Sequence, residues 1–383
     1  MNTRTFFEAG FRPFFLFAAL YAVISQLAWM GLYVFHTQGD VHGVALYSWH
    51  AHEMIYGYCM AVVAGFLLTA ARNWTGQKTL DGPELALLVL LWTLPRALFW
   101  VNEIPLFVIA ISDIAFNAYL LFAIARPVFK VQQWRQKIIL GILALALIGN
   151  VAFYFAHLGG PAVLLRISLY GSLYILVGLI ILMGRRVIPM FSKNGVPGCT
   201  PLQNHEWLDK VLPLVFIACI ITDIASPNNR IGAALSAIMS ILMFIRLAGW
   251  YRNAFWSWPM VWILHVALFW VAFGFALKAS SHWLGISPYL ALHALAYGAV
   301  GSITIGMMAR VSLGHTGRSV TQPPMLIKWS FILITIGTII RVITPIFLPE
   351  YYINIILIAQ IFWIMAFALF VFVYTPYLLK PRI

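Results

Sequence analysis

The stretch SWHAHEMIYGY, residues 48–58, places three ionisable side chains, His50, His52 and Glu53, at the start of a long apolar run. Burying an ionisable group in apolar surroundings costs free energy, so a chain that keeps one there is expected to use it. Neutral imidazole is a common ligand of metals and haem, because one ring nitrogen binds while a hydrogen bond to the other orients the ring. These residue types therefore point to metal or haem binding.

Helical geometry limits how the three side chains can cooperate. Residues two apart on a helix point about 200° apart, so His50 and His52 cannot face one centre unless the helix begins between them. Glu53 follows His50 by three residues and shares its face. We therefore expect His52 to face the protein interior, with His50 and Glu53 as a second ligand set or as an orienting pair.

A related pattern recurs late in the chain. HEMIYGYCMAVVAGFLLTAARNWTG begins at His52 and HALAYGAVGSITIGMMARVSLGHTG begins at His293, and both fit H-x3-Y-G-x7-G-x9-T-G without a gap. A looser third fit begins at Arg166 and hints at three pseudo-repeats of four helices. Chance agreement between similar compositions is the alternative, and glycines at such spacing also let helices pack closely.

Other candidates follow from the histidines and arginines in apolar runs. His52 and His293 occupy equivalent places in the repeat, so their imidazoles could bind one haem from opposite faces. His265 and His315 are further metal-ligand candidates, and a hydrogen-bonded core position is the alternative for His265. Bidentate guanidinium suits haem propionates, although a long side chain reaching the membrane interface is the alternative. The arginines concerned are Arg96, Arg166 and Arg341.

The elements that must position these groups are membrane-spanning helices. The 383 residues are 62% hydrophobic and only 9% charged, and a helix needs about 20 mostly apolar residues to cross the bilayer. Twelve such runs predict an all-α polytopic membrane protein that forms a single transmembrane domain over residues 1–383. The runs are 13–35, 50–71, 84–101, 104–125, 137–157, 161–183, 208–224, 231–249, 256–277, 288–309, 327–347 and 352–375.

The net charge of +13 reflects membrane topology. Most Lys and Arg residues lie at the termini and in the connections 72–83, 126–136, 184–207, 250–255 and 310–326, and positive residues mark the cytoplasmic side. Both termini are therefore expected in the cytoplasm, with the lipid bilayer and not nucleic acid as the partner. The three cysteines form no CxxCH motif, so a haem would be bound without covalent attachment.

Several blocks carry a family resemblance: AGFRPFF at 9–15, WHAHEM at 49–54, AGFLLTAARNWTG at 64–76, GRRVIPMF at 184–191, LH at 264–265 and HALAYGAVGSITIGMMARVSLGHTGR at 293–318. In this order they resemble the NnrS family. The resemblance implies a bacterial inner-membrane protein that contains haem (haem b) and copper and acts in the response to nitric oxide and nitrosative stress. The matching histidines are His50, His52, His265, His293 and His315.

The layout is also similar to subunit I of the haem-copper oxidases and nitric oxide reductases. That family has twelve spans with threefold pseudosymmetry, and its spans two and ten hold a haem between histidines. It also carries metal ligands on spans six and seven, where this chain has no histidine. A binuclear centre of that kind is therefore not expected, and His50 and His265 are the better candidates for binding copper.

Three functions remain open at this stage. The first is a haem oxidoreductase that handles nitric oxide, such as a nitric oxide reductase. A haem with both axial positions filled by His52 and His293 would transfer electrons without binding the gas, so reduction would need a second centre. The second is a twelve-helix transporter, and the third is a haem-based nitric oxide sensor. The sequence identifies neither catalytic residues nor an electron donor.

Overall fold

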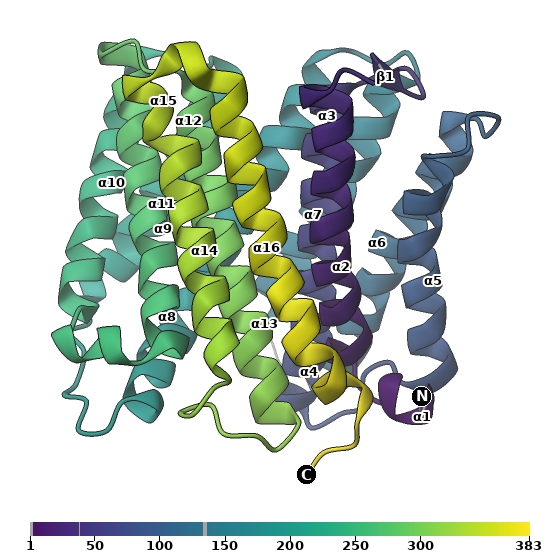
Figure 1. Ribbon diagram of the computed structural model, residues 1–383, viewed down its shortest axis with the longest axis vertical. Coiled ribbons are helices and arrows are strands. Elements are labelled where there is room, and N and C mark those ends of the chain that lie inside the picture. The colour runs from purple at the N-terminus through teal and green to yellow at the C-terminus, as the bar shows by residue number, and fades with distance from the viewer. Residues whose placement is uncertain (1–2, 38, 133–135) are drawn as a thin grey trace. The chain divides into compact units, whose positions relative to one another are not determined.

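The computed structural model describes residues 3–37, 39–132 and 136–383, and the predicted all-α fold is confirmed. The only strands among these residues form a two-stranded hairpin, β1 (Asp40–Val41) and β2 (Val44–Ala45). His42 and Gly43 in its turn both have positive φ, 54° and 74°, which suits the tight turn of such a hairpin. The hairpin leads directly into α3 (Leu46–His52) (Figure 1).

Ten helical segments among the described residues are long and apolar enough to cross a membrane. They are Phe11–Val34 (α2 and η1), Leu46–Thr75 (α3, η2 and α4), Leu106–Lys130 (α6), Lys137–His157 (α7), Val163–Gly195 (α8), Arg230–Trp250 (α10), Pro259–Trp283 (α11), Pro288–His315 (α12, η5 and α13), Met325–Phe347 (α14 and α15) and Pro349–Leu379 (η6 and α16).

The remaining two predicted runs are also helical, as α5 (Gly82–Leu98) and α9 (Glu206–Ala225). Helix α5 has only 17 residues. Helix α9 carries four charged residues, Glu206, Asp209, Lys210 and Asp223, which are costly in a bilayer. The crossing of the membrane by these two helices stays a prediction, as does the total of twelve spans.

The prediction was wrong about the end of the sixth run. Helix α8 continues to Gly195, twelve residues beyond the predicted end at 183, and so includes Arg185 and Arg186. These residues are good helix formers, and their long side chains reach water while the backbone stays helical. Part of the basic connection 126–136, residues 133–135, lies outside the described residues.

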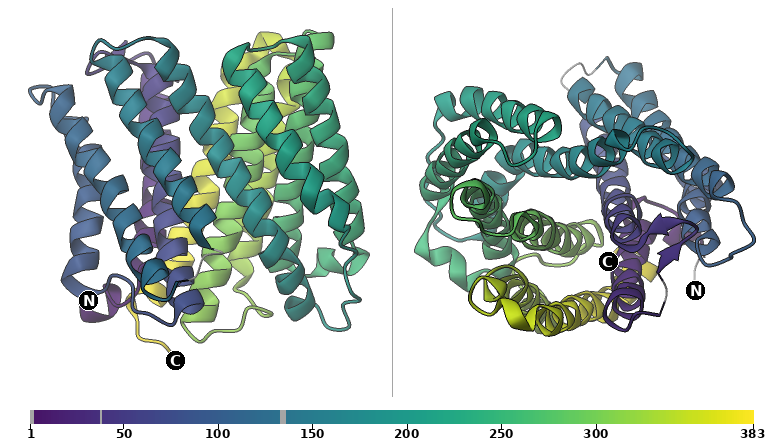
Figure 2. Two further views of the ribbon diagram at one scale, coloured as in Figure 1. Left: turned by 180° about the vertical axis from the view of Figure 1, so that it is seen from behind. Right: turned by 90° about the horizontal axis from the view of Figure 1, so that it is seen from above.

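The helices form two compact units. Unit 1 comprises Met1–Ile175, Val311–Arg318 and Phe370–Ile383, and unit 2 comprises Leu176–Arg310 and Ser319–Leu369. In unit 1, α5 packs beside α6 and α6 beside α7 (Figure 2). In unit 2, α10 packs beside α11 (Figure 1). A single transmembrane domain over residues 1–383 remains a prediction.

Both ends of the chain belong to unit 1. Helix α1 (Thr3–Phe6) lies at the same end of this unit as the last turn of α16 (Figure 1). The buried Arg12 Nη1 donates to the carbonyl oxygens of Leu378, at 2.8 Å, and Lys380, at 2.7 Å. This arrangement agrees with two termini on one side of a membrane, and their cytoplasmic location remains a prediction.

The sequence repeat has a counterpart in the backbone of each unit. His52 is the last residue of α3 and is followed by a π-helix, η2 (Glu53–Cys59), and then by α4 (Met60–Thr75). His293 is likewise the last residue of α12 (Pro288–His293), before the π-helix η5 (Ala294–Gly301) and α13 (Ser302–His315). Two π-helices directly after equivalent histidines are uncommon enough to argue against chance agreement of the sequences.

The repeated glycines serve close packing in both copies. A Cβ at Gly65 would lie 2.7 Å from the ring of Phe15 on α2 (Phe11–Trp29), and a Cβ at Gly306 would lie 2.8 Å from Ile263 on α11. The glycine at the end of each copy is left-handed, with φ +65° at Gly76 and +82° at Gly317. These glycines therefore allow close helix packing and also occupy equivalent positions in a structural repeat.

Candidate functional site

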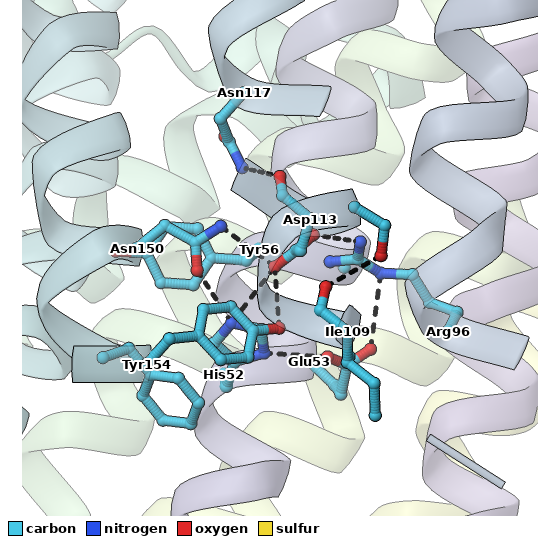
Figure 3. A network of polar contacts seen from close by, with 12 residues as sticks. His52, Glu53, Tyr56, Arg96, Ile109, Asp113, Asn117, Asn150 and Tyr154 are labelled. Carbon is cyan, nitrogen blue, oxygen red and sulfur yellow. Dashed lines mark hydrogen bonds and ion pairs between the residues drawn. The ribbon is translucent and has the colours of Figure 1, made fainter. Parts of the chain in front are cut away.

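A buried network of charged and polar side chains lies inside unit 1 (Figure 3). Its centre is His52, at the end of α3, which contacts the first residue of η2 and side chains from α6 and α7. Every member of the network is buried. The members whose side chains contact one another directly are Tyr21, His52, Glu53, Arg96, Asp113, Asn150 and Tyr154.

Both ring nitrogens of His52 face oxygen acceptors. Nδ1 lies 2.8 Å from Glu53 Oε1, and Nε2 lies 3.0 Å from Asn150 Oδ1 and 3.3 Å from Asp113 Oδ2. The amide of Asn150 is oriented by its own nitrogen, which donates to Asp113 Oδ2 at 2.9 Å. An imidazole between two acceptors donates from both nitrogens and therefore carries two protons.

The formal charges of the network agree with this assignment. Arg96 forms ion pairs with Asp113, through Nη1, and with Glu53, whose Oε2 lies 3.4 Å from Nε. One guanidinium and two carboxylates leave one negative charge, and an imidazolium at His52 cancels it. A neutral buried cluster avoids the desolvation penalty that a net charge would carry. His52 is thus placed to hold a proton.

The pairing of Glu53 with His50 stays a prediction, and the structure shows other partners for Glu53. The Glu53 carboxylate accepts a hydrogen bond from Tyr21 and contacts His52 and Arg96. The prediction assumed a regular α-helix, whereas Glu53 begins the π-helix η2. His50 is half-buried and stacks on Trp29, with ring centroids 4.3 Å apart.

Asp113 is held through both its backbone and its carboxylate. Asn117 Nδ2 donates to the backbone oxygen of Asp113 at 3.1 Å and not to its carboxylate. The carboxylate is bound instead by Arg96, Asn150 and Tyr154, with the Tyr154 hydroxyl at 3.2 Å. The sequence reasoning overlooked Asn150, whose polar side chain within the apolar run 137–157 was the available signal.

His293 has a different environment, in unit 2. Its Nδ1 donates to the carbonyl oxygen of Tyr289 at 2.7 Å, which leaves Nε2 with the lone pair. Arg341 Nη2 lies 3.1 Å from this Nε2 and 3.3 Å from the Tyr352 hydroxyl. The structure therefore brings two predicted site residues, His293 and Arg341, together.

The arginines Arg96 and Arg341 occupy matching positions. Each lies on the helix that follows a copy of the repeat, α5 and α14 (Met325–Val342), and each contacts the beginning of that copy. They differ in their partners, because Arg96 meets carboxylates whereas Arg341 meets an imidazole and a phenol. Both copies of the repeat thus have an arginine at the matching position, but the two arginines have different partners.

His265, on α11, also has the geometry of a ligand. Its Nδ1 donates to the Val261 carbonyl oxygen at 3.1 Å, and its buried Nε2 has no hydrogen-bond partner among the residues that the structure describes. Its ring packs against Phe255, with centroids 4.7 Å apart. A buried, orientated imidazole with an unused lone pair suits a metal or haem iron.

His265 and His293 cannot share one metal ion. Gly274 packs on Ala294 and Leu295, whereas Gly306 packs on Leu264, so the two histidines lie at different levels of the antiparallel pair formed by α11 and the α12–η5–α13 segment. Gly274 and His265 are about 14 Å apart along α11 at the usual helical rise. A shared metal ion would have to lie about 2 Å from a ring nitrogen of each histidine, and the two levels are too far apart for that.

The remaining predicted residues have other surroundings. His315 is half-buried in unit 1, with its ring centroid 5.5 Å from that of Phe11. Arg166 is half-buried on α8, and its buried Nε has no hydrogen-bond partner in the described part of the chain. No group of three or more His, Cys, Asp or Glu side chains within residues 3–37, 39–132 and 136–383 is arranged to hold a metal ion.

The fold and the buried polar groups define an all-α polytopic membrane protein with ionisable side chains in its interior. The family model described as NnrS protein matches residues 5–382, which is nearly the whole chain. The chain therefore belongs to the NnrS family, as its sequence blocks predicted. No curated protein matches it.

Proposed function

We propose that this protein acts in the nitric oxide response by handling nitric oxide at a haem b in the membrane, and that His293 would bind the haem iron. The observation that supports His293 is the hydrogen bond from its Nδ1 to the Tyr289 carbonyl, which leaves the lone pair on Nε2. An iron would take this lone pair in place of Arg341 Nη2, which lies 3.1 Å from Nε2. The NnrS family assignment supports the nitric oxide response. Bound haem would supply an iron that binds the gas and exchanges electrons.

Arg341 is the residue that we expect to bind a haem propionate. Its guanidinium lies beside His293, and its buried Nη1 has no hydrogen-bond partner among the described residues. No carboxylate within the described residues forms an ion pair with it, and guanidinium pairs well with a carboxylate. Arg166 remains a candidate from the sequence, and its buried Nε has no hydrogen-bond partner among the described residues.

His52 has a separate role in this proposal. With both nitrogens donating to oxygens, it offers no lone pair to iron unless Nε2 leaves Asn150 and Asp113. Reduction of nitric oxide consumes protons, and a buried imidazolium next to two carboxylates can store one. A haem shared between His52 and His293 remains a prediction from the sequence. Binding of its iron by His52 would require the hydrogen bonds of this network to break.

Copper is a second proposed cofactor, and His265 is the candidate ligand that fits it best. Imidazole is a suitable ligand for copper, and the Nε2 of His265 is buried without a hydrogen-bond partner among the described residues. His50, the other sequence candidate for copper, belongs to unit 1 and stacks on Trp29. The copper content of the purified wild type should exceed that of His265→Ala.

Optical spectra test the haem proposal. The full chain is purified with adequate haem supply, and oxidised and reduced spectra are recorded for the wild type, His293→Ala, His52→Ala and, as a control, His282→Ala. We expect haem bands to be lost or strongly altered only in His293→Ala. Loss in both His52→Ala and His293→Ala would instead favour the shared haem, and a colourless wild type would overturn the proposal.

A transporter is the second candidate function, and the His52 network is the observation that favours it. Ionisable residues buried inside a membrane protein often belong to proton or ion pathways. A colourless protein with proton-coupled uptake into vesicles would support this alternative. For a haem protein, consumption of added nitric oxide would indicate an enzyme, and binding without consumption would indicate a sensor.

The location that we propose is the bacterial inner membrane, with both termini in the cytoplasm. The basic connections favour this orientation by the positive-inside rule. A fluorescent protein fused to the C-terminus should fluoresce, whereas an alkaline phosphatase fused there should be inactive. The opposite pair of results would reverse the topology.

A further inference from the structure

Arg310, near the end of α13, is a buried cation that lacks a counter-ion. Its side chain is 5% exposed, and no carboxylate in the described part of the chain forms an ion pair with it. Its Nη1 is buried and has no hydrogen-bond partner, and its Nη2 reaches only the Phe191 carbonyl oxygen, at 3.5 Å. An unpaired charge in a protein interior costs several kcal/mol.

Other buried arginines of this chain are better satisfied. Arg96 has two carboxylates and Arg246 has Asp209, while Arg12 donates to carbonyl oxygens at the end of α16. Arg341 contacts His293 and Tyr352. Arg310, with a single long hydrogen bond, therefore has fewer polar partners than these other buried arginines.

Residues of helix α8 lie next to the Arg310 guanidinium. The guanidinium lies over the ring of Phe191, 3.9 Å from its centroid, and a Cβ on Gly195 would lie 3.5 Å from Nη1. Ser192 is three residues before Gly195 and so shares its helix face. The Ser192 hydroxyl is fully buried and has no hydrogen-bond partner among the described residues. All of these residues belong to unit 2.

We infer that Arg310 and Ser192 form a binding site for a small planar oxyanion, a carboxylate or a nitrite-like ion. Stacking on Phe191 holds the guanidinium plane, so its edge can donate two parallel hydrogen bonds to a planar anion. The Ser192 hydroxyl supplies a further donor, and the absence of a side chain on Gly195 lets the Arg310 guanidinium lie close to α8, beside Val261. The observations that support this site involve neither the proposed haem nor its ligand His293.

The test measures anion binding to the purified full chain in detergent. Acetate and nitrite are titrated into the wild type and Arg310→Gln by calorimetry, with chloride as a spherical anion for comparison. We expect both planar anions to bind the wild type and to bind Arg310→Gln about tenfold or more weakly, as loss of a hydrogen bond to a charged group predicts. Arg230→Gln, which removes an exposed cation of unit 2, should bind as the wild type does.

Two further variants separate loss of the site from loss of the fold. Ser192→Ala keeps the charge and should weaken binding by a smaller factor, whereas Arg310→Lys keeps the charge without the planar fork and should also bind more weakly. Equal binding of acetate to the wild type and Arg310→Gln would overturn the site. Equal binding of chloride and acetate to the wild type would overturn the planar specificity.

A comparison of haem-free and haem-loaded protein identifies the source of the anion. Acetate that binds equally to both forms indicates a site for a free anion. Acetate that binds only to the haem-free form indicates that a cofactor carboxylate fills the site. Acetate binding to neither form contradicts the inference even if the haem proposal holds, so the two proposals fail separately.

Discussion

The imidazole of His52 and the side-chain amide of Asn150 meet at 3.0 Å, with the amide oxygen facing Nε2. The same amide donates to Asp113 at 2.9 Å, so rotating it would bring two oxygens together. Glu53 occupies the other side of the ring. Equivalent positions in a repeat therefore have different chemistry: His52 is a proton donor to two oxygens, whereas His293 keeps a lone pair next to Arg341.

The ion pair between Arg96 and Asp113 should show strong coupling in a double-mutant cycle. Arg96→Gln or Asp113→Asn alone leaves a buried charge without its partner, and each should lower the free energy of unfolding by about 3–5 kcal/mol. The double variant removes one charge of each sign and should be more stable than the sum of the single effects predicts. Denaturant unfolding in detergent micelles measures all three.

An exposed ion pair provides the control for this cycle. Lys78 and Asp81 lie 3.9 Å apart and are largely exposed, so Lys78→Gln and Asp81→Asn should each change stability by less than about 1 kcal/mol. Additive effects for Arg96 and Asp113, within the error of the measurement, would contradict their description as one buried unit.

Arg341 should matter for haem retention without being an iron ligand. Arg341→Gln removes the cation that we expect to pair with a propionate, so the purified variant should contain less haem than the wild type. The band positions of the haem that remains should be nearly unchanged, because His293 is still present. Arg341→Lys should recover part of the haem content. Arg230→Gln is the control, and a shift of the bands in Arg341→Gln would contradict a propionate role.

Apolar runs predicted the all-α fold and the helices because membrane-spanning segments must satisfy their backbone internally. The same runs could not predict the π-helices, since η2 and η5 differ from α-helix only in hydrogen-bond register. Glu53, the first residue of η2, contacts Tyr21 and Arg96, and the spacing of residues along the sequence did not indicate these contacts. Spacing rules hold only while the helical period holds.

The candidate site was predictable as a set of residues but not as a set of contacts. Histidines and arginines in apolar runs are rare enough to be noticed, and the repeat placed His52 and His293 correctly at matching helix ends. The proton positions depend on Asn150 and Tyr289, which come from other turns and helices. Tertiary hydrogen bonds of this kind leave no periodic signal in the sequence.

Gly57, in the π-helix η2, should not tolerate a methyl group. A Cβ there would lie 2.6 Å from the Tyr21 ring and 3.0 Å from Glu53 Oε2, so Gly57→Ala should displace Tyr21 and lower stability by about 1–3 kcal/mol. Gly141 is the matched control, because a Cβ on this α7 residue meets nothing within 4 Å. Gly141→Ala should be neutral or should stabilise by up to about 1 kcal/mol. Equal losses in both variants would contradict the packing argument.

The last turn of α16 should depend on Arg12, which lies on α2 more than 360 residues earlier in the chain. Each hydrogen bond from its guanidinium to the carbonyl oxygens of Leu378 and Lys380 contributes about 1.5–3 kcal/mol as a bond to a charged group. Arg12→Met should therefore release the C-terminal segment and speed its cleavage by carboxypeptidase. Arg4→Gln, which changes an exposed cation at the same end of unit 1, should leave the cleavage rate unchanged. A C-terminus that is cleaved equally fast in the wild type and in Arg12→Met would contradict this role of Arg12. Other contacts would then hold the segment, and water would satisfy the carbonyl groups at the end of the helix.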